Sequence, residues 1–131
     1  MKKNKISKNW INKQKRDIYV RQSKLEGYRS RAVYKLQEIQ TKFKVINNGM
    51  SIVDLGAAPG SWSEFISRKF KNIKLVAIDL KELDKIQNVT HIKGDFTDEI
   101  TQKKIEKNFD EKIDLVVSDI AVNTTGNKNV D

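Results

Sequence analysis

The sequence predicts an α/β fold in which helices cover both faces of a parallel β-sheet. Along residues 50–119, short apolar segments alternate with segments of helical pattern. The apolar segments are rich in β-branched residues, which is typical of strands that are buried on both faces. Each of them ends at or near an aspartate, and these residues are Asp54, Asp79, Asp95 and Asp119. Because ligands of such sheets bind at the carboxyl ends of the strands, the four acids predict one shared site.

Two helices are expected before the sheet. Residues 1–9 are rich in lysine and are predicted to be disordered. A weak helical pattern extends from Trp10 to Glu26, and Gly27 is expected to end this helix. Ser30 is a candidate N-cap for the second helix. The apolar stripe of the second helix consists of Ala32, Leu36, Ile39 and Phe43.

The elements of the sheet region follow in order. Strands are expected at Ser51–Leu55, Lys74–Leu80, Val89–Lys93 and Ile113–Val117. Helices are expected from about Ser63 to Phe70 and from Asp98 to Asn108, the second with Ile100 and Ile105 facing inward. We therefore divide the chain into an N-terminal segment of helices, residues 1–49, and a sheet-bearing segment, residues 50–131.

The composition excludes several classes of function. The 131 residues are enough for one domain, which we expect to be monomeric. The sequence has no cysteine, which excludes a disulfide framework, a thiolate zinc site and a cysteine nucleophile. No apolar run is long enough to span a membrane and no signal peptide is recognisable, so a cytoplasmic location is expected. The lone histidine, His91, is interpreted as structural, and no metal site is predicted.

The net charge of +9 is unevenly distributed along the chain. Residues 1–49 hold 14 Lys or Arg and three acids, a balance of +11, whereas residues 50–131 have a balance of −2. A basic segment followed by a nearly neutral one indicates a polyanionic partner, either nucleic acid or an anionic membrane surface.

The first strand leads into a glycine-rich turn, Gly56–Gly60. The turn lacks both the G-x-G-x-x-G pattern of dinucleotide sites and the Lys-Ser or Lys-Thr of a P-loop. Its glycines nevertheless allow the backbone to approach a ligand closely. Asp79 follows Gly60 by 19 residues, close to the spacing at which an acid binds ribose hydroxyls in Rossmann-type folds. A ribose-bearing cofactor without pyrophosphate is therefore predicted, and S-adenosylmethionine fits.

Three motifs in register resemble the FtsJ/RrmJ family of ribosomal RNA 2′-O-ribose methyltransferases. They are the segment Glu26–Leu36, the turn Asp54–Trp62, and the sequence Ser-Asp-Ile-Ala-Val-Asn at residues 118–123. The similarity extends from about Asp17 to the last residue. Among the members, the chain is most similar to the bacterial form that methylates a uridine of large-subunit ribosomal RNA. The resemblance implies a Rossmann-like methyltransferase fold, of which about the first four strands are present here.

The resemblance also implies roles for individual residues. Gly60, Trp62, Asp79, Asp95 and Asp119 match positions that bind S-adenosylmethionine. Lys35 and Asp119 match two members of a catalytic Lys-Asp-Lys-Glu tetrad, in which the second lysine is the base.

Tyr28, Arg29 and Arg31 are the candidate contacts to RNA, and the two arginines are expected to bind its phosphates. Tyr19, Tyr28 and Tyr34 could stack on bases or could be packing residues, and packing is favoured for Tyr34.

Two departures from the family pattern bear on activity. The second lysine and the glutamate of the tetrad would lie beyond Asp131, so the chain is expected to be a C-terminally truncated form that is inactive or nearly inactive alone. Val122 stands where the family usually has proline. The leading hypothesis is thus a ribosomal RNA 2′-O-methyltransferase, and the alternative is a non-catalytic RNA-binding remnant. A dehydrogenase is disfavoured by the glycine pattern, and a small-molecule methyltransferase by the basic segment.

Overall fold

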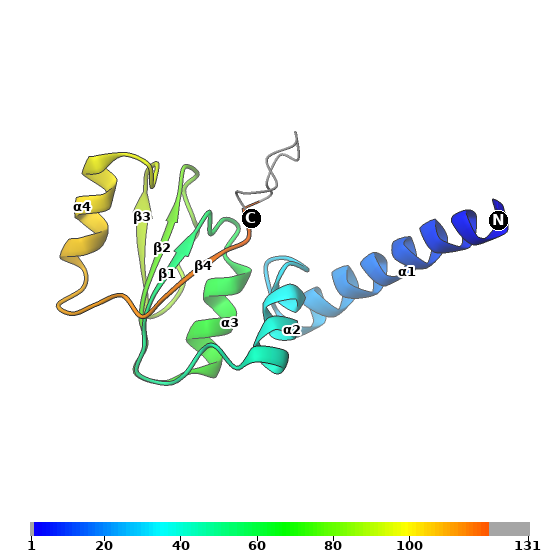
Figure 1. Cartoon of the computed structure of the whole chain (residues 1–131), viewed down its shortest axis with the longest axis horizontal. Coiled ribbons are helices and arrows are strands. Elements are labelled where there is room, and N and C mark those ends of the chain that lie inside the picture. The colour runs from blue at the N-terminus through cyan, green and yellow to red at the C-terminus, as the bar shows by residue number, and fades with distance from the viewer. Residues whose placement is uncertain (1, 121–131) are drawn as a thin grey trace.

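A four-stranded parallel sheet forms the centre of the molecule (Figure 1). This computed structural model describes residues 2–120, and side chains from residue 9 onward. The strands are β1 (Ser51–Leu55), β2 (Lys74–Asp79), β3 (Val89–Lys93) and β4 (Leu115–Ser118), in the spatial order β3-β2-β1-β4. Their bounds agree with the expected strands to within two residues. The parallel α/β architecture predicted from the sequence is therefore confirmed.

Helices cover both faces of the sheet. On one face, Ile52 of β1 and Leu75 of β2 share a core with side chains of α2 (Val33–Phe43) and α3 (Ser61–Lys69). On the other face, Val53 and Val76 pack with Ile105 of α4 (Glu99–Lys107). Successive residues of β1 thus enter opposite cores, because side chains alternate along a strand. Figure 1 shows α4 beside β3, and Val116 of β4 on that face is 54% exposed.

The first helix, α1 (Lys2–Glu26), projects away from the sheet (Figure 1). The disorder predicted for residues 1–9 is wrong for residues 2–9, which are helical. The segment holds neither Gly nor Pro, so nothing in it interrupts a helix that continues from Trp10. The apolar residues spaced by seven, Ile11, Ile18 and Leu25, are exposed. Despite its length α1 is strongly polar, and within residues 2–120 no helix could cross a bilayer.

Two details of helix orientation differ from expectation. In α2 the core-facing residues are Val33 and Leu36, while Phe43, predicted to lie on the apolar stripe, is 70% exposed. In α4, Ile105 is buried as predicted but Ile100 is 72% exposed. Residues five apart on an α-helix are separated by about 140° of rotation, so Ile100 and Ile105 cannot face the same core. Thr101, four residues before Ile105, is buried in its place.

The turn before α2 also differs from the predicted cap. The helix begins at Val33, so Ser30 is not its N-cap. Instead, the Ser30 hydroxyl accepts the Ala32 N–H at 3.3 Å and shares a hydrogen bond of 2.9 Å with the Ser61 hydroxyl. Ser30 therefore joins the entry of α2 to the first residue of α3.

Candidate functional site

The carboxyl ends of the strands meet at one edge of the sheet, as the sequence predicts. In the parallel register Asp54 pairs with Val117, and Leu55 pairs with both Ile78 and Ser118. A small cavity of about 40 Å³ lies at this edge. It is lined by Asp54, Asp119, Trp62, Ala32 and residues of the glycine-rich turn. The acids of β1 and β4 are therefore brought to one place.

Asp54 is the most deeply buried acid of this site, with 1% of its surface exposed. Its carboxylate accepts a hydrogen bond of 2.7 Å from the Ser63 hydroxyl. The pKa of Asp54 is raised to about 7, mainly by burial and also by the charges of Asp119 and Asp79, against the effect of the Ser63 hydrogen bond. A buried acid among other acids favours a cationic ligand, because a nearby positive charge would offset both the desolvation and the mutual repulsion.

The glycine-rich turn is compact and immediately precedes a helix N-terminus. Gly60 has φ +117°, and a Cβ on it would lie 2.8 Å from Ile86 Cδ1. The dihedral angle therefore favours glycine at this position, and a larger residue would also have to displace the end of the Ile86 side chain. Because α3 begins at Ser61, the amides of its first turn lie next to the cavity, where they favour an anionic group.

Asp79 and Asp95 are bound to nearby backbone groups. Asp79 accepts N–H groups from Ala58 at 2.9 Å and from Lys81 at 2.8 Å, so it connects the glycine-rich turn to the end of β2. Asp95 accepts the N–H and hydroxyl of Thr97, and these hydrogen bonds lower its pKa. An ionised carboxylate has about four acceptor sites, so both can still accept hydroxyl groups of a ligand.

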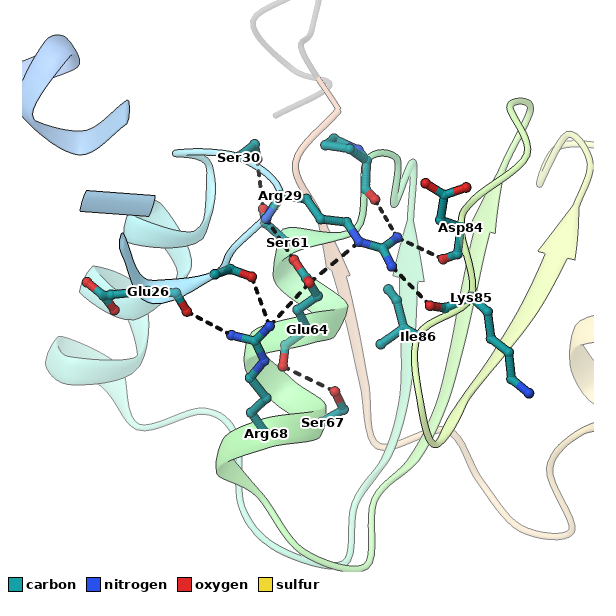
Figure 2. A network of polar contacts seen from close by, with 12 residues as sticks. Glu26, Arg29, Ser30, Ser61, Glu64, Ser67, Arg68, Asp84, Lys85 and Ile86 are labelled. Carbon is teal, nitrogen blue, oxygen red and sulfur yellow. Dashed lines mark hydrogen bonds and ion pairs between the residues drawn. The ribbon is translucent and has the colours of Figure 1, made fainter. Parts of the chain in front are cut away.

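Arg29 connects the glycine-rich turn to the loop between β2 and β3 (Figure 2). Its guanidinium group donates to the Pro59 carbonyl at 3.0 Å, and to the carbonyls of Asp84 at 2.8 Å and Lys85 at 3.0 Å. The next residue in that loop, Ile86, donates its N–H to His91 Nε2 at 3.3 Å. The Arg29 guanidinium group is thus already hydrogen-bonded to carbonyls of the protein. The phosphate contact expected of it stays a prediction.

Glu64 of α3 is the acidic partner of this arginine. Its carboxylate accepts the Arg29 backbone N–H at 2.9 Å and lies 3.5 Å from Arg29 Nε. Arg68 approaches the same carboxylate at 3.4 Å and also donates to the carbonyls of Glu26 and Gly27. Sequence reasoning missed Glu64, because nothing in its local pattern distinguishes it from a solvent-facing glutamate of α3.

Two aromatic residues predicted to contact ligands are largely buried in the core. Tyr28 is 7% exposed, and the Arg68 guanidinium lies over its ring, 4.6 Å from the centroid. Trp62 is 5% exposed and its indole N–H donates to the Ala32 carbonyl at 2.8 Å. Both packing arrangements hold the N-terminal segment on α3. The RNA contact of Tyr28 and the cofactor contact of Trp62 stay predictions.

Lys35 and Asp119 are brought together from opposite ends of the chain. Lys35 Nζ, on α2, lies 3.6 Å from Asp119 Oδ1, just after β4. The two side chains are 66% and 33% exposed, so the pair is open to solvent. Both residues also line a larger pocket, of about 740 Å³, that includes Arg31. A catalytic role for the pair remains a prediction from the motif.

Comparison with known proteins identifies the family. A model described as FtsJ-like methyltransferase matches residues 28–131, which include the glycine-rich turn and both members of the Lys35–Asp119 pair. The chain belongs to the FtsJ-like methyltransferase family. The matched residues 121–131, with Val122 among them, lie outside the part of the chain that the structure describes.

Named relatives of this FtsJ-like chain are similar over its whole length. The ribosomal RNA large subunit methyltransferase E of Pelagibacter ubique is 63% identical over all of this chain and 64% of its own length. The protein of the same name from Pseudomonas fluorescens is 47% identical, again over all of this chain and 64% of its own length. The chain thus spans somewhat less than two thirds of these relatives.

A crystal structure described as a ribosomal RNA methyltransferase of Plasmodium falciparum has the same fold. It superposes with a TM-score of 0.66 at 37% identity, covering 79% of this chain and 62% of the other. This agreement supports a Rossmann-like methyltransferase fold for the FtsJ-like domain.

Replacing Asp54 by Asn is expected to stabilise the fold in a pH-dependent manner. An unfolded aspartate ionises near pH 4, whereas folded Asp54 ionises near pH 7. The native chain therefore holds the extra proton between these values, and its free energy of unfolding falls as the pH rises through that window. The advantage of Asp54→Asn over the wild type should grow by about 2–3 kcal/mol between pH 5 and pH 8, measured by urea denaturation. A pH-independent difference would contradict the burial of an ionisable Asp54.

Replacing Arg29 by Ala is expected to destabilise the fold by roughly 1–3 kcal/mol, because it removes the ion pair with the buried Glu64 carboxylate and the three hydrogen bonds to the carbonyls of Pro59, Asp84 and Lys85. Arg31→Ala is the matched control, since Arg31 is exposed, and its effect should stay within about 0.5 kcal/mol. Thermal unfolding monitored by circular dichroism measures both variants. Equal stability of the two would show that Arg29 does not hold the turn.

Proposed function

We propose that this chain binds S-adenosylmethionine and acts in 2′-O-methylation of a ribose, at a uridine of large-subunit ribosomal RNA. The observation that carries the proposal is the Lys35–Asp119 pair, which stands beside the glycine-rich turn and also opens to the larger pocket. The pair thus adjoins both the small cavity at the strand ends and the larger pocket. The names of the relatives support a ribosomal RNA substrate.

The residues of the crevice fit the chemical groups of S-adenosylmethionine. Asp54 and Asp119 are carboxylates suited to its amine and sulfonium charges, and Asp79 can accept its ribose hydroxyls. The N-terminus of α3 suits its carboxylate. Asp95 would lie near the adenine of the cofactor. When bound, the sulfonium supplies a methyl group that is already reactive towards an oxygen nucleophile.

The chain's own residues would orient the substrate for that transfer. A ribose hydroxyl is a weak nucleophile, so positioning and removal of its proton contribute most to the rate. Lys35 would hold the substrate ribose or an adjacent phosphate, and Asp119 would orient the Lys35 ammonium group. No residue of this chain is assigned as the base that accepts the hydroxyl proton.

The RNA face is proposed to comprise α1 and the exposed side of α2, within the basic segment of residues 1–49. Arg31 is exposed and lines the larger pocket, so it is better placed than Arg29 for a phosphate contact. The exposed residues Lys13, Lys15 and Arg16 extend the positive charge along α1. An RNA-bound enzyme of this kind would act in the cytoplasm.

Measurements of cofactor binding and of methyl transfer separate the candidate functions. Calorimetry should show binding of S-adenosylmethionine and none of a nicotinamide dinucleotide. Any transfer of a labelled methyl group to ribosomal RNA would support the methyltransferase, and Lys35→Ala should then lower transfer by about 100-fold or more while cofactor affinity is kept. Cofactor and RNA binding without transfer would favour the alternative, a non-catalytic RNA-binding protein. Failure to bind S-adenosylmethionine would contradict the cofactor assignment.

Neutralising Lys13, Lys15 and Arg16 together by Gln should weaken RNA binding and its salt dependence. Each lost phosphate contact lowers the slope of log affinity against log salt by roughly 0.7 for a single strand. The matched control replaces Lys103, Lys104 and Lys107 of α4, which are equally exposed and lie at the opposite end of the molecule (Figure 1). Fluorescence anisotropy at several salt concentrations measures both. Equal slopes for the two triple variants would remove α1 from the RNA face.

A further inference from the structure

The larger pocket lies where α1 meets α2, and it opens to the Lys35–Asp119 pair. Its volume of about 740 Å³ is within the range of about 300–1,000 Å³ that is usual for small-molecule sites. Tyr19 and Gln22 of α1 line one side of it, and Tyr34, Lys35 and Gln37 of α2 line the other. Aromatic rings, side-chain amides and a cation are therefore gathered next to the proposed site of methyl transfer.

Two tyrosines form a stacked pair in this pocket. The rings of Tyr19 and Tyr34 have centroids 5.1 Å apart and are inclined by 24°. Tyr19 is 41% exposed, so its ring is only partly covered by Tyr34. A flat, accessible aromatic surface of this kind can stack on any base, because every base has a π-face.

Polar contacts hold the Tyr34 ring in place. The Tyr34 hydroxyl donates to Glu26 at 3.0 Å, and the Gln22 amide donates to the same carboxylate oxygen at 2.7 Å. Burial, followed by the interactions with Glu26, raises the pKa of Tyr34 to about 12, so the phenol stays neutral. The Tyr34 ring, against which Tyr19 stacks, is thus positioned before any ligand arrives, which lowers the entropic cost of binding.

The groups around the rings match a nucleotide rather than an apolar ligand. Arg31 and Lys35 are exposed cations suited to phosphates, and the Gln37 amide can both donate to and accept from a base edge. Tyr34 and Lys35 line the same pocket, so a base on the aromatic pair would have its sugar and phosphates within the pocket that Lys35 also lines.

We propose that this pocket binds an unpaired nucleobase of the RNA strand, stacked on Tyr19 beside the Lys35–Asp119 pair. The inference rests on the proposed function and adds to it a base-binding subsite. A base held there must be out of a duplex, since a base stacked between its neighbours inside a duplex offers neither face to a protein ring. The subsite therefore selects a single-stranded or flipped nucleotide for the reaction.

The test compares two substitutions of Tyr19 on two RNA probes. Tyr19→Phe keeps the ring, whereas Tyr19→Leu keeps an apolar side chain that can pack on Tyr34 but has no π-face. The probes are single-stranded heptauridylate and a heptamer of abasic ribonucleotides with the same phosphate charge. Anisotropy at low salt measures affinity, and circular dichroism with S-adenosylmethionine calorimetry verifies that each variant folds and binds cofactor.

Tyr19→Leu should weaken binding of heptauridylate roughly 5- to 150-fold, while Tyr19→Phe stays within about twofold of the wild type. On the abasic probe the three proteins should bind equally. Equal affinity of wild type and Tyr19→Leu for heptauridylate, or equal losses on both probes, would overturn the base-binding subsite while leaving the proposed function intact. If the wild-type chain binds neither probe, both the base-binding subsite and the proposed function would be overturned.

Photocrosslinking tests the same contact without a substitution. An RNA heptamer containing 5-iodouridine should crosslink to the Tyr19 ring, and mass spectrometry of the digested adduct locates the attachment. Crosslinks confined to peptides that contain neither Tyr19 nor Tyr34 would overturn the subsite even if Tyr19→Leu proved unstable.

Discussion

The buried carboxylate of Glu64 holds together segments that are far apart in the sequence. It lies between the guanidinium groups of Arg29 and Arg68 and accepts the Arg29 backbone N–H as well. Through Arg29 the contact reaches the glycine-rich turn and the loop after β2, and through Arg68 it reaches the end of α1. Leaving one partner of such a buried group unpaired costs more than the intact contact contributes, so these segments are expected to form or separate together.

The geometry of the proposed reaction site depends on this packing rather than on its own ion pair. Lys35 and Asp119 are substantially exposed, and an exposed pair contributes only about 0–1 kcal/mol. Their separation is set instead by the position of α2 relative to β4. The hydrogen bond from the Trp62 indole to Ala32 and the one between Ser30 and Ser61 fix the entry of α2 on α3, and α3 packs on the sheet that carries β4.

The sheet and its site edge could be predicted because their signals are local. A strand buried on both faces must be continuously apolar, and the acids at its end mark the carboxyl edge, so the strands and the meeting of Asp54 with Asp119 follow from the pattern. The contacts of Arg29 with Glu64 and with the loop carbonyls could not be predicted from the sequence. A charged residue next to a basic motif shows no periodic pattern that would indicate its burial. The same holds for Tyr28, which the motif placed on the RNA face and the fold buries. Recognising Glu64 as their common neighbour needs the packing of α3 against the N-terminal segment, which no local pattern encodes.

The distribution of charge acquires a structural meaning once the elements are placed. The acids gather at the strand ends, where burial raises the pKa of Asp54 and makes the crevice favourable for a cation. The basic residues of α1 and α2 lie outside that crevice and suit a polyanion. The Lys35–Asp119 pair stands where these two regions meet, with one member from each. A methyl group carried on a cationic sulfonium would have to pass to an oxygen of an anionic strand at such a boundary. In the proposed transfer, the two opposite electrostatic requirements would thus be met by separate elements, which the packing of α2 beside the sheet brings together.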